Sequence, residues 1–223
     1  MIAEFAELFS PAFPIGEKSI SLAQEMEASK VKRLIAVNEF IHEDTSTGIF
    51  LMRQNSRMRE LAEALPNMKM RIIPTPCVRI SRGVSHTSDL HKLTLNKTGY
   101  ILTSPPYGGF SDEIMLEYRN LIINEKLVPV IMYFERCVAG YDDYNLNRII
   151  GISSAVFQIS GRALVDVKLR KTVESLLEDN RTVIISDNRV FDKKKKKFSL
   201  TAPSRKLYEY LIVKNNSFYL KIF

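Results

Sequence analysis

The chain has 223 residues, of which 45% are hydrophobic and 26% are charged, a composition close to the globular average. This balance excludes a disordered chain, a collagen and a disulfide-stabilised miniprotein. The apolar runs fall well short of the ~18 residues that a membrane-spanning helix needs, so we expect no transmembrane segment. The length allows one large domain or two small ones.

The net charge of +7 belongs to the last fifth of the chain. Residues 181–223 contain eleven of the 32 Lys and Arg residues but only three of the 25 acids, and residues 1–180 are nearly neutral. A local positive patch attracts phosphate, as nucleic acid or as an anionic surface, although a lysine run is often only a solvated hairpin tip. The candidate anion-binding residues form one uninterrupted run: Lys193, Lys194, Lys195, Lys196 and Lys197.

Residues 1–67 predict an N-terminal α/β extension or small domain. Their apolar runs alternate with polar turns and proline breakers, which favours short helices and strands. The expected elements are a short helix at 2–9, a helix at 17–32, a hairpin of strands 34–41 and 49–52, and a helix at 56–65. Ser56 is the candidate cap of the last helix, and Pro66 ends it.

Residues 68–170 change to a pattern of strands and turns. Apolar runs are separated by prolines, by polar loops and by an Asn-Lys-Thr-Gly turn at 96–99, where Asn and Gly suit positive φ angles. The expected strands are 70–73, 77–80, 100–103, 128–138 and 148–159, whereas 113–123 fits either a helix or a strand. We therefore predict an α+β protein whose middle is dominated by antiparallel strands.

Residues 171–223 predict a basic C-terminal segment that packs on the central domain. The expected elements are a helix at 172–177, a strand at 182–186, a hairpin at 190–200 with the lysine run at its tip, and a hairpin of strands 207–213 and 218–223. Each hairpin is predicted from two apolar runs on either side of a polar turn.

The cysteines and histidines do not form a recognisable catalytic or metal site. Cys77 and Cys137 have apolar neighbours, so we expect two buried free thiols and, without a secretory segment, a cytoplasmic location. Cys137 lacks the arginine six positions later that a cysteine phosphatase needs, because Asp143 stands there. His86 and His91 are too widely spaced for a zinc site.

The segment Thr103-Ser104-Pro105-Pro106-Tyr107 resembles the catalytic motif of amino-group DNA methyltransferases. Those enzymes also need a Gly-rich cofactor turn, and this chain contains no Gly-x-Gly. We therefore interpret the segment as a proline-rich turn that ends a strand. A serine-hydrolase elbow and a phosphate-binding P-loop are missing as well, so the sequence predicts no enzyme, no metal and no cofactor.

The order of features in residues 70–168 resembles that of the PilZ family of small bacterial β-barrels. The matching parts are Arg79-Ile80-Ser81-Arg82, the turn Asn96-Lys97-Thr98-Gly99 with the strand after it, and later Gly151 and Phe157. The two arginines are one residue closer together than in the family, and the turn is one residue shorter. Both parts of the family's ligand site are therefore altered here.

The resemblance implies a mainly antiparallel PilZ-like β-barrel at 68–170, and members that bind cyclic di-GMP use these arginines and this turn. The expected ligand-binding residues are Arg79, Arg82, Asn96, Thr98 and Gly99. Arginine suits that ligand because its planar guanidinium binds phosphate and stacks on a base. We expect a non-enzymatic bacterial regulatory or interaction protein, with cyclic di-GMP or another protein as partner. The alternative is a nucleic-acid or anionic-surface binder that uses residues 193–197.

Overall fold

The computed structural model describes residues 3–6, 14–107, 109–186 and 202–222. Seven strands form one sheet in the order β1-β2-β3-β4-β5-β6-β7, and each neighbouring pair is parallel. The strands are β1 (Ala3–Ala6), β2 (Arg33–Phe40), β3 (Arg71–Arg79), β4 (Tyr100–Ser104), β5 (Val128–Ile131), β6 (Val156–Ser160) and β7 (Thr182–Ser186).

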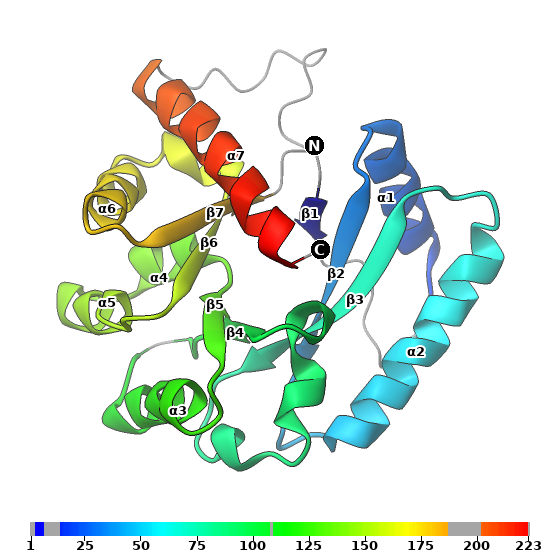
Figure 1. Ribbon diagram of the computed structural model, residues 1–223, viewed down its shortest axis with the longest axis horizontal. Helices are drawn as coiled ribbons and strands as arrows, with labels where there is room; N and C mark the ends of the chain where they lie inside the picture. Colours follow the sequence, from blue (N-terminus) through cyan, green and yellow to red (C-terminus); the bar gives the residue numbers. More distant parts are fainter. Residues whose placement is uncertain (1–2, 7–13, 108, 187–201, 223) are drawn as a thin grey trace.

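Three short 3₁₀ helices lie between β3 and β4, whereas α-helices lie between the other successive strands and after β7. The α-helices are α1 (Glu17–Ala28), α2 (Thr47–Ala64), α3 (Asp112–Ile123), α4 (Phe134–Gly140), α5 (Asp143–Ile150), α6 (Val167–Glu178) and α7 (Ala202–Ile222). Crossovers of one hand in a sequential parallel sheet place the helices on one face, as in α/β barrels. Figure 1 shows α1 to α6 around the outside of a curled sheet, and α7 packs along β7.

Both faces of the sheet are buried, as is usual for parallel sheets. Alternate strand residues point to opposite faces. One set packs under the helices: Phe40, Val78, Ile101, Ile131, Phe157 and Val183. The other set forms a second core on the opposite, concave face: Val37, Cys77, Leu102, Val130, Val156 and Ile184. Burial on both faces explains why these strands appear in the sequence as continuous apolar runs.

Four helices begin at a side chain that accepts a backbone N–H. Ser46, Ser111, Asp142 and Asp166 cap α2, α3, α5 and α6, respectively. Such caps satisfy amide groups that have no partner within the helix. They fix where each helix starts after the loop at the end of the preceding element.

Two prolines lie within β3, a position that normally disfavours them because proline has no amide hydrogen. The amide of Arg71 donates towards β2, and that of Ile80 donates to the last residue of β4. Since alternate amides point to the same side, Pro74 and Pro76 face the β4 side. Pairing with β4 begins only at Cys77, so the prolines remove no hydrogen bond from the sheet.

Several predicted elements are confirmed, namely the helix at 17–32 and the strands at 34–41, 100–103 and 182–186. The helix at 2–9 is wrong, because Ala3–Ala6 is β1. The hairpin of 34–41 and 49–52 is wrong as well, since α2 begins at Thr47 and includes the second predicted strand. The helix predicted at 56–65 is the second half of α2, and its cap is Ser46 rather than Ser56.

Later elements also depart from the prediction. The strand at 128–138 ends at Ile131 and is followed by α4, and the one at 148–159 is divided between α5 and β6. The ambiguous segment 113–123 is a helix, α3. The hairpin at 207–223 is wrong because residues 202–222 form α7, with Leu207 and Leu211 buried four residues apart. The hairpin predicted at 190–200 lies outside the described residues.

The predicted mainly antiparallel, PilZ-like β-barrel is wrong, because all six strand pairings of the sheet are parallel. The sheet also takes strands from each of the three predicted segments, 1–67, 68–170 and 171–223. Within the described ranges, no helix is long and apolar enough to span a membrane.

Candidate functional site

The carboxyl ends of the strands and the loops that follow them carry a group of polar and charged side chains. In α/β proteins with parallel strands, this edge is where the loops meet and where sites are formed. Here it brings together side chains from β2 through β7 and their loops: Glu39, Arg79, Ser104, Tyr107, Tyr133, Glu135, Arg136, Ser160 and Ser186.

An ion pair joins the ends of β2 and β3. Arg79 donates from Nε and Nη2 to the two carboxylate oxygens of Glu39, at 3.1 and 2.7 Å. Ser104, at the end of β4, donates its hydroxyl to Glu39 Oε1 at 3.5 Å. The side chains of Arg79 and Glu39 are 36% and 43% exposed, so water screens the pair. The pair neutralises both charges and occupies both oxygens of Glu39.

A second arginine lies beside a small cavity between the ends of β4 and β5. Arg136 Nη1 donates to the Tyr107 hydroxyl at 3.2 Å, and its Cζ lies 4.2 Å from the centre of the Tyr133 ring. The cavity measures about 70 Å³ and is lined by Ser104, Pro105, Pro106, Tyr107, Met132, Tyr133, Arg136, Cys137, Gly140 and Tyr141. Arg136 is exposed, and its guanidinium is held in place by the Tyr133 ring and the Tyr107 hydroxyl.

The backbone at Tyr133 has a left-handed conformation, with φ at 54° and ψ at 44°. A non-glycine residue in this region is strained, and such strain often marks functional sites. Gln158, which is fully buried in β6, accepts a hydrogen bond from the Tyr133 amide at 2.7 Å. Gln158 in turn donates to the Ser186 hydroxyl at the end of β7. These bonds fix the turn that carries Tyr133 and Arg136.

Glu135 connects the same turn to β6. Its Oε1 accepts the Ser160 hydroxyl at 3.0 Å, and its Oε2 accepts the Ser160 amide at 3.3 Å. Burial raises the pKa of Glu135 above its usual value, and the hydrogen bonds from Ser160 offset this only in part. Glu135 is not among the residues lining the cavity beside Arg136. We therefore assign it to holding α4 against β6.

Cys137 is not suited to act as a nucleophile. Burial, with a smaller contribution from the charge of Glu135, raises the pKa of its thiol to about 12. The reactive thiolate is therefore scarce at neutral pH. The sequence points the same way, because Asp143 stands where a cysteine phosphatase needs an arginine.

A third arginine nearby is already occupied. Arg148 donates to the Phe110 carbonyl at 2.7 Å and to Asp112 Oδ1 at 2.5 Å. It supports the 105–111 loop, and Tyr141 supports the same loop by donating to the Pro106 carbonyl at 2.6 Å. These contacts leave Arg136 as the best candidate for binding a ligand anion at this edge.

The structure separates the five residues predicted to bind a ligand into two groups. Arg79 ends β3 and is paired with Ser104, whereas Gly99 precedes β4 at the opposite end of the sheet. Five residues of strand at ~3.3 Å each place the two groups roughly 16 Å apart. The highly exposed Arg82 lies 3.8 Å from Glu113, a residue of α3.

The turn at 96–99 has a structural role at the amino end of β4. Asn96 and Lys97 take the positive φ angles, at 49° and 58°, and Gly99 does not. The Thr98 hydroxyl donates to the Leu95 carbonyl at 2.6 Å, and the Gly99 carbonyl accepts from Val128 at 2.8 Å. The lysine run Lys193–Lys197 lies outside the described residues.

No protein-family model and no curated protein sequence matches the chain. Among solved structures, it is similar to a chain from the crystal structures of YwqE from Bacillus subtilis and CpsB from Streptococcus pneumoniae. Those proteins are described as unique metal-dependent tyrosine phosphatases. The similarity has a TM-score of 0.63 and 18% sequence identity, and it covers 95% of this chain and 94% of that chain. The fold is thus shared over nearly the whole length.

This similarity corrects the function inferred from the sequence. The expected PilZ-like regulator of cyclic di-GMP depended on an antiparallel barrel, and the chain instead has the α/β fold of a phosphatase structure. The expectation of a non-enzymatic protein came from the absence of recognised catalytic motifs, and the similarity to a phosphatase structure contradicts it. The alternative of a nucleic-acid or anionic-surface binder stays a prediction, because residues 193–197 lie outside the described ranges.

The described residues do not fit a metal centre of the kind that the neighbour's description implies. Within residues 3–6, 14–107, 109–186 and 202–222, no group of three His, Cys, Asp or Glu side chains could hold a metal ion. Both oxygens of Glu39 bind Arg79, and both of Glu135 bind Ser160. A guanidinium beside Glu39 also opposes a divalent cation there. We therefore assign no role to a metal.

Sequence patterns alone do not bring together the residues that meet beside the cavity. Tyr107 was included only in a rejected methyltransferase motif, and Tyr133 and Arg136 were placed inside one long strand. The available signal was the charged pair Glu135-Arg136, which interrupts the apolar run at 128–138 and does not suit a strand buried on both faces. The proline-rich turn after β4 was predicted and is observed.

Proposed function

We propose that the chain is an enzyme that acts on aryl phosphate monoesters such as phosphotyrosine. The phosphoryl group would be bound by Arg136 at the carboxyl edge of the sheet. The observation that carries the proposal is the position of Arg136, exposed beside a cavity at the edge where α/β barrels form their active sites. The shared fold with a tyrosine phosphatase structure supports the same reaction class.

The geometry around Arg136 suits such a substrate. A guanidinium can donate parallel N–H groups to two phosphoryl oxygens. In Arg136, Nη1 already donates a hydrogen bond to the Tyr107 hydroxyl at 3.2 Å. A cavity of about 70 Å³ is large enough for a phosphoryl group but not for the whole ester. The rings of Tyr107 and Tyr133 and the adjoining prolines offer apolar surface to an aromatic leaving group.

We also propose that the protein works in the cytoplasm. Cys77 and Cys137 are both buried and both free. Free thiols in pairs are typical of reducing compartments. This assignment supports a substrate that is present inside the cell.

The test is hydrolysis of p-nitrophenyl phosphate and of a phosphotyrosine peptide by the full chain, measured with and without Mn²⁺. We expect turnover of both, and a fall in kcat/KM of at least about tenfold in Arg136→Met, because a phosphate would lose its charged partner. Arg119→Met is the matched control, since Arg119 is exposed on α3 and does not line the cavity.

Two results would contradict the proposal. The absence of turnover in every metal condition would exclude phosphatase activity. Turnover that falls equally in Arg136→Met and Arg119→Met would place the phosphoryl group somewhere other than Arg136.

A further inference from the structure

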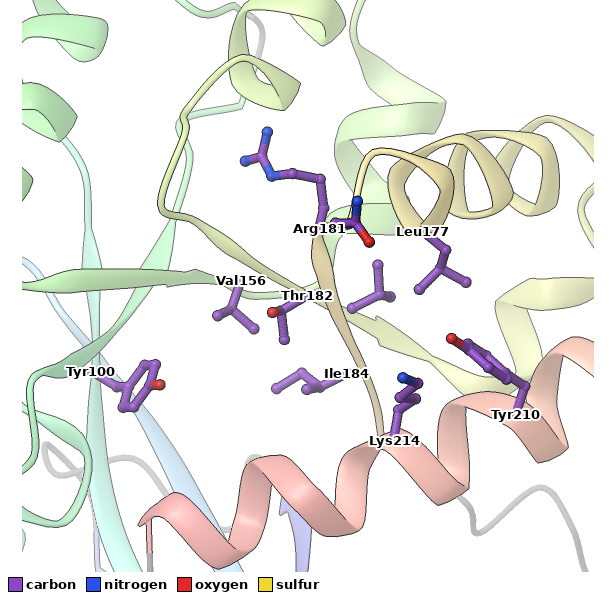
Figure 2. A pocket seen from close by; sticks show the side chains of 10 residues that line it. Tyr100, Val156, Leu177, Arg181, Thr182, Ile184, Tyr210 and Lys214 are labelled. Atoms are coloured by element: carbon purple, nitrogen blue, oxygen red, sulfur yellow. The ribbon is translucent and has the colours of Figure 1, made fainter.

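A second and larger cavity lies at the opposite end of the sheet, under α7. It measures about 260 Å³ and is formed where β4, β6 and β7 begin. Figure 2 shows α7 on one side of this cavity and the sheet on the other. The lining residues are Tyr100, Val156, Leu177, Asn180, Arg181, Thr182, Val183, Ile184, Tyr210 and Lys214. The site proposed for phosphate esters lies at the other end of the strands.

The sheet side of the cavity is apolar. Val156 and Ile184 belong to the concave core, and they are 4% and 1% exposed. Leu177, from the end of α6, adds a partly buried hydrophobic side chain. Binding of a ligand with an apolar body would be favourable here, because it would remove the apolar surface of the cavity and of the ligand from water.

The α7 side of the cavity carries a positive charge. Lys214 and Tyr210 point from α7 towards Thr182 and Ile184 in Figure 2, and Lys214 Nζ lies 5.5 Å from the Tyr210 ring. None of the ten described lining residues is acidic. The ammonium group of Lys214 therefore faces the cavity without a carboxylate among these neighbours to balance it.

Arg181 contributes to the wall but not to the charge of the cavity. Its guanidinium donates to the Ile150 carbonyl at 2.8 Å and to the Ile152 carbonyl, and it lies 5.3 Å from the Phe157 ring. In Figure 2 its side chain points away from Lys214. A ligand would thus meet one cation, together with the hydroxyl and amide groups of Tyr100, Thr182 and Asn180.

We propose that this cavity binds a small organic monoanion with an apolar body, such as a single-ring aromatic carboxylate. One ammonium matches one negative charge, and the apolar wall matches a ring. The volume is equivalent to about eight or nine water molecules, which suits a single ring and not a nucleotide. The site does not depend on the proposed phosphatase activity, because it shares no residue with the cavity beside Arg136.

The test is a titration of the full chain with benzoate, followed by the amide NMR signals of Thr182 and Ile184. We expect saturable shifts of these signals and none at Arg136. Benzyl alcohol, which has the ring without the charge, should bind about fivefold more weakly. Lys214→Met should weaken benzoate binding by a similar factor, and circular dichroism should show an unchanged fold because Lys214 is exposed.

Lys206→Met is the matched control, since Lys206 is an exposed lysine of α7 that does not line the cavity. Unchanged binding in this variant supports the proposal. The proposal is overturned if benzoate does not shift Thr182 or Ile184, if Lys214→Met binds as tightly as the parent, or if Lys206→Met weakens binding equally. The last result would indicate a general attraction of anions to a basic helix.

Discussion

At the carboxyl end of the sheet, Arg79 is bound by the carboxylate of Glu39, whereas at the amino end Arg181 is bound by the backbone carbonyls of Ile150 and Ile152. The first pair is partly exposed and is screened by water. The second arginine connects the start of β7 to the segment between α5 and β6. An arginine thus neutralises a carboxylate at one end of the sheet and binds partly buried backbone carbonyls at the other.

This comparison shows why the number of basic residues is a poor guide to function. Arg79 was predicted to bind a ligand, yet its donors are used by Glu39. Arg136 and Lys214 are exposed, and each lies at a cavity with aromatic neighbours and no carboxylate among the described lining residues. The partners of a cation, and not its presence, decide whether it can hold an anion.

Among substitutions at the two ends of the sheet, we expect Arg181→Met to lower the free energy of unfolding most. Removing the guanidinium leaves two carbonyls without their charged donor, so we expect a loss of about 2–3 kcal/mol in the free energy of unfolding. Urea unfolding measures this difference, with Arg119→Met as the exposed control. A loss no larger than that of the control would show that water replaces Arg181, and the contrast between the two ends would disappear.

The second prediction concerns Glu135, whose pKa is raised by burial from the ordinary value of 4.5. Above the ordinary pKa, the carboxyl group of Glu135 therefore stays protonated in the folded chain, whereas in the unfolded chain it has lost its proton. The contribution to stability is therefore complete below that ordinary pKa and decreases as the pH rises through the higher folded value. We expect Glu135→Gln to flatten this decrease above about pH 4.5 in urea unfolding.

Glu174→Gln serves as the control for Glu135, because Glu174 is an exposed residue of α6. It should leave the pH dependence as it is. If Glu135→Gln leaves the slope unchanged too, the carboxyl group is solvated and does not hold α4 to β6 in the manner described.

The smallest expected effect belongs to the Glu39–Arg79 pair. A double-mutant cycle of Glu39→Gln and Arg79→Met should give a coupling energy of at most about 1 kcal/mol, because both side chains are partly exposed. The coupling should decrease further at high salt. A coupling above about 2 kcal/mol would mean that the carboxyl end is as desolvated as the amino end.

The sequence predicts strands better than their direction. The runs that form β2, β4 and β7 are recognisable because they are apolar and end at polar turns. Whether two such runs form a hairpin or a parallel pair depends on the segment between them. After β2 that segment contains Ser46, which caps α2, and Phe50, which belongs to the apolar run that predicts the second strand of a hairpin. In the structure this run is part of α2 and Phe50 packs against the helix-covered face of the sheet.

The candidate site was harder to predict than the fold. Tyr107 and Arg136 are 29 residues apart in the chain, and they meet because β4 and β5 are adjacent and parallel. With antiparallel pairing assumed, the ends of these strands lie at opposite edges, and no pattern places the two side chains together. At the other end of the sheet, Leu207 and Leu211 have the spacing of one face of a helix. The Asn-Asn-Ser segment at 215–217 is typical of a turn, however, and for this reason the sequence predicts a hairpin there.

The prolines of β3 have a consequence for how copies of this chain behave in a crowded solution. Along residues 71–76, β3 has no partner on the side of β4, and an unpaired flank of this kind can recruit a strand from another molecule. Pro74 and Pro76 have no amide hydrogen, so only Ile72 can donate from that flank. Intermolecular β-pairing, and the aggregation that follows from it, is thereby discouraged along this part of β3.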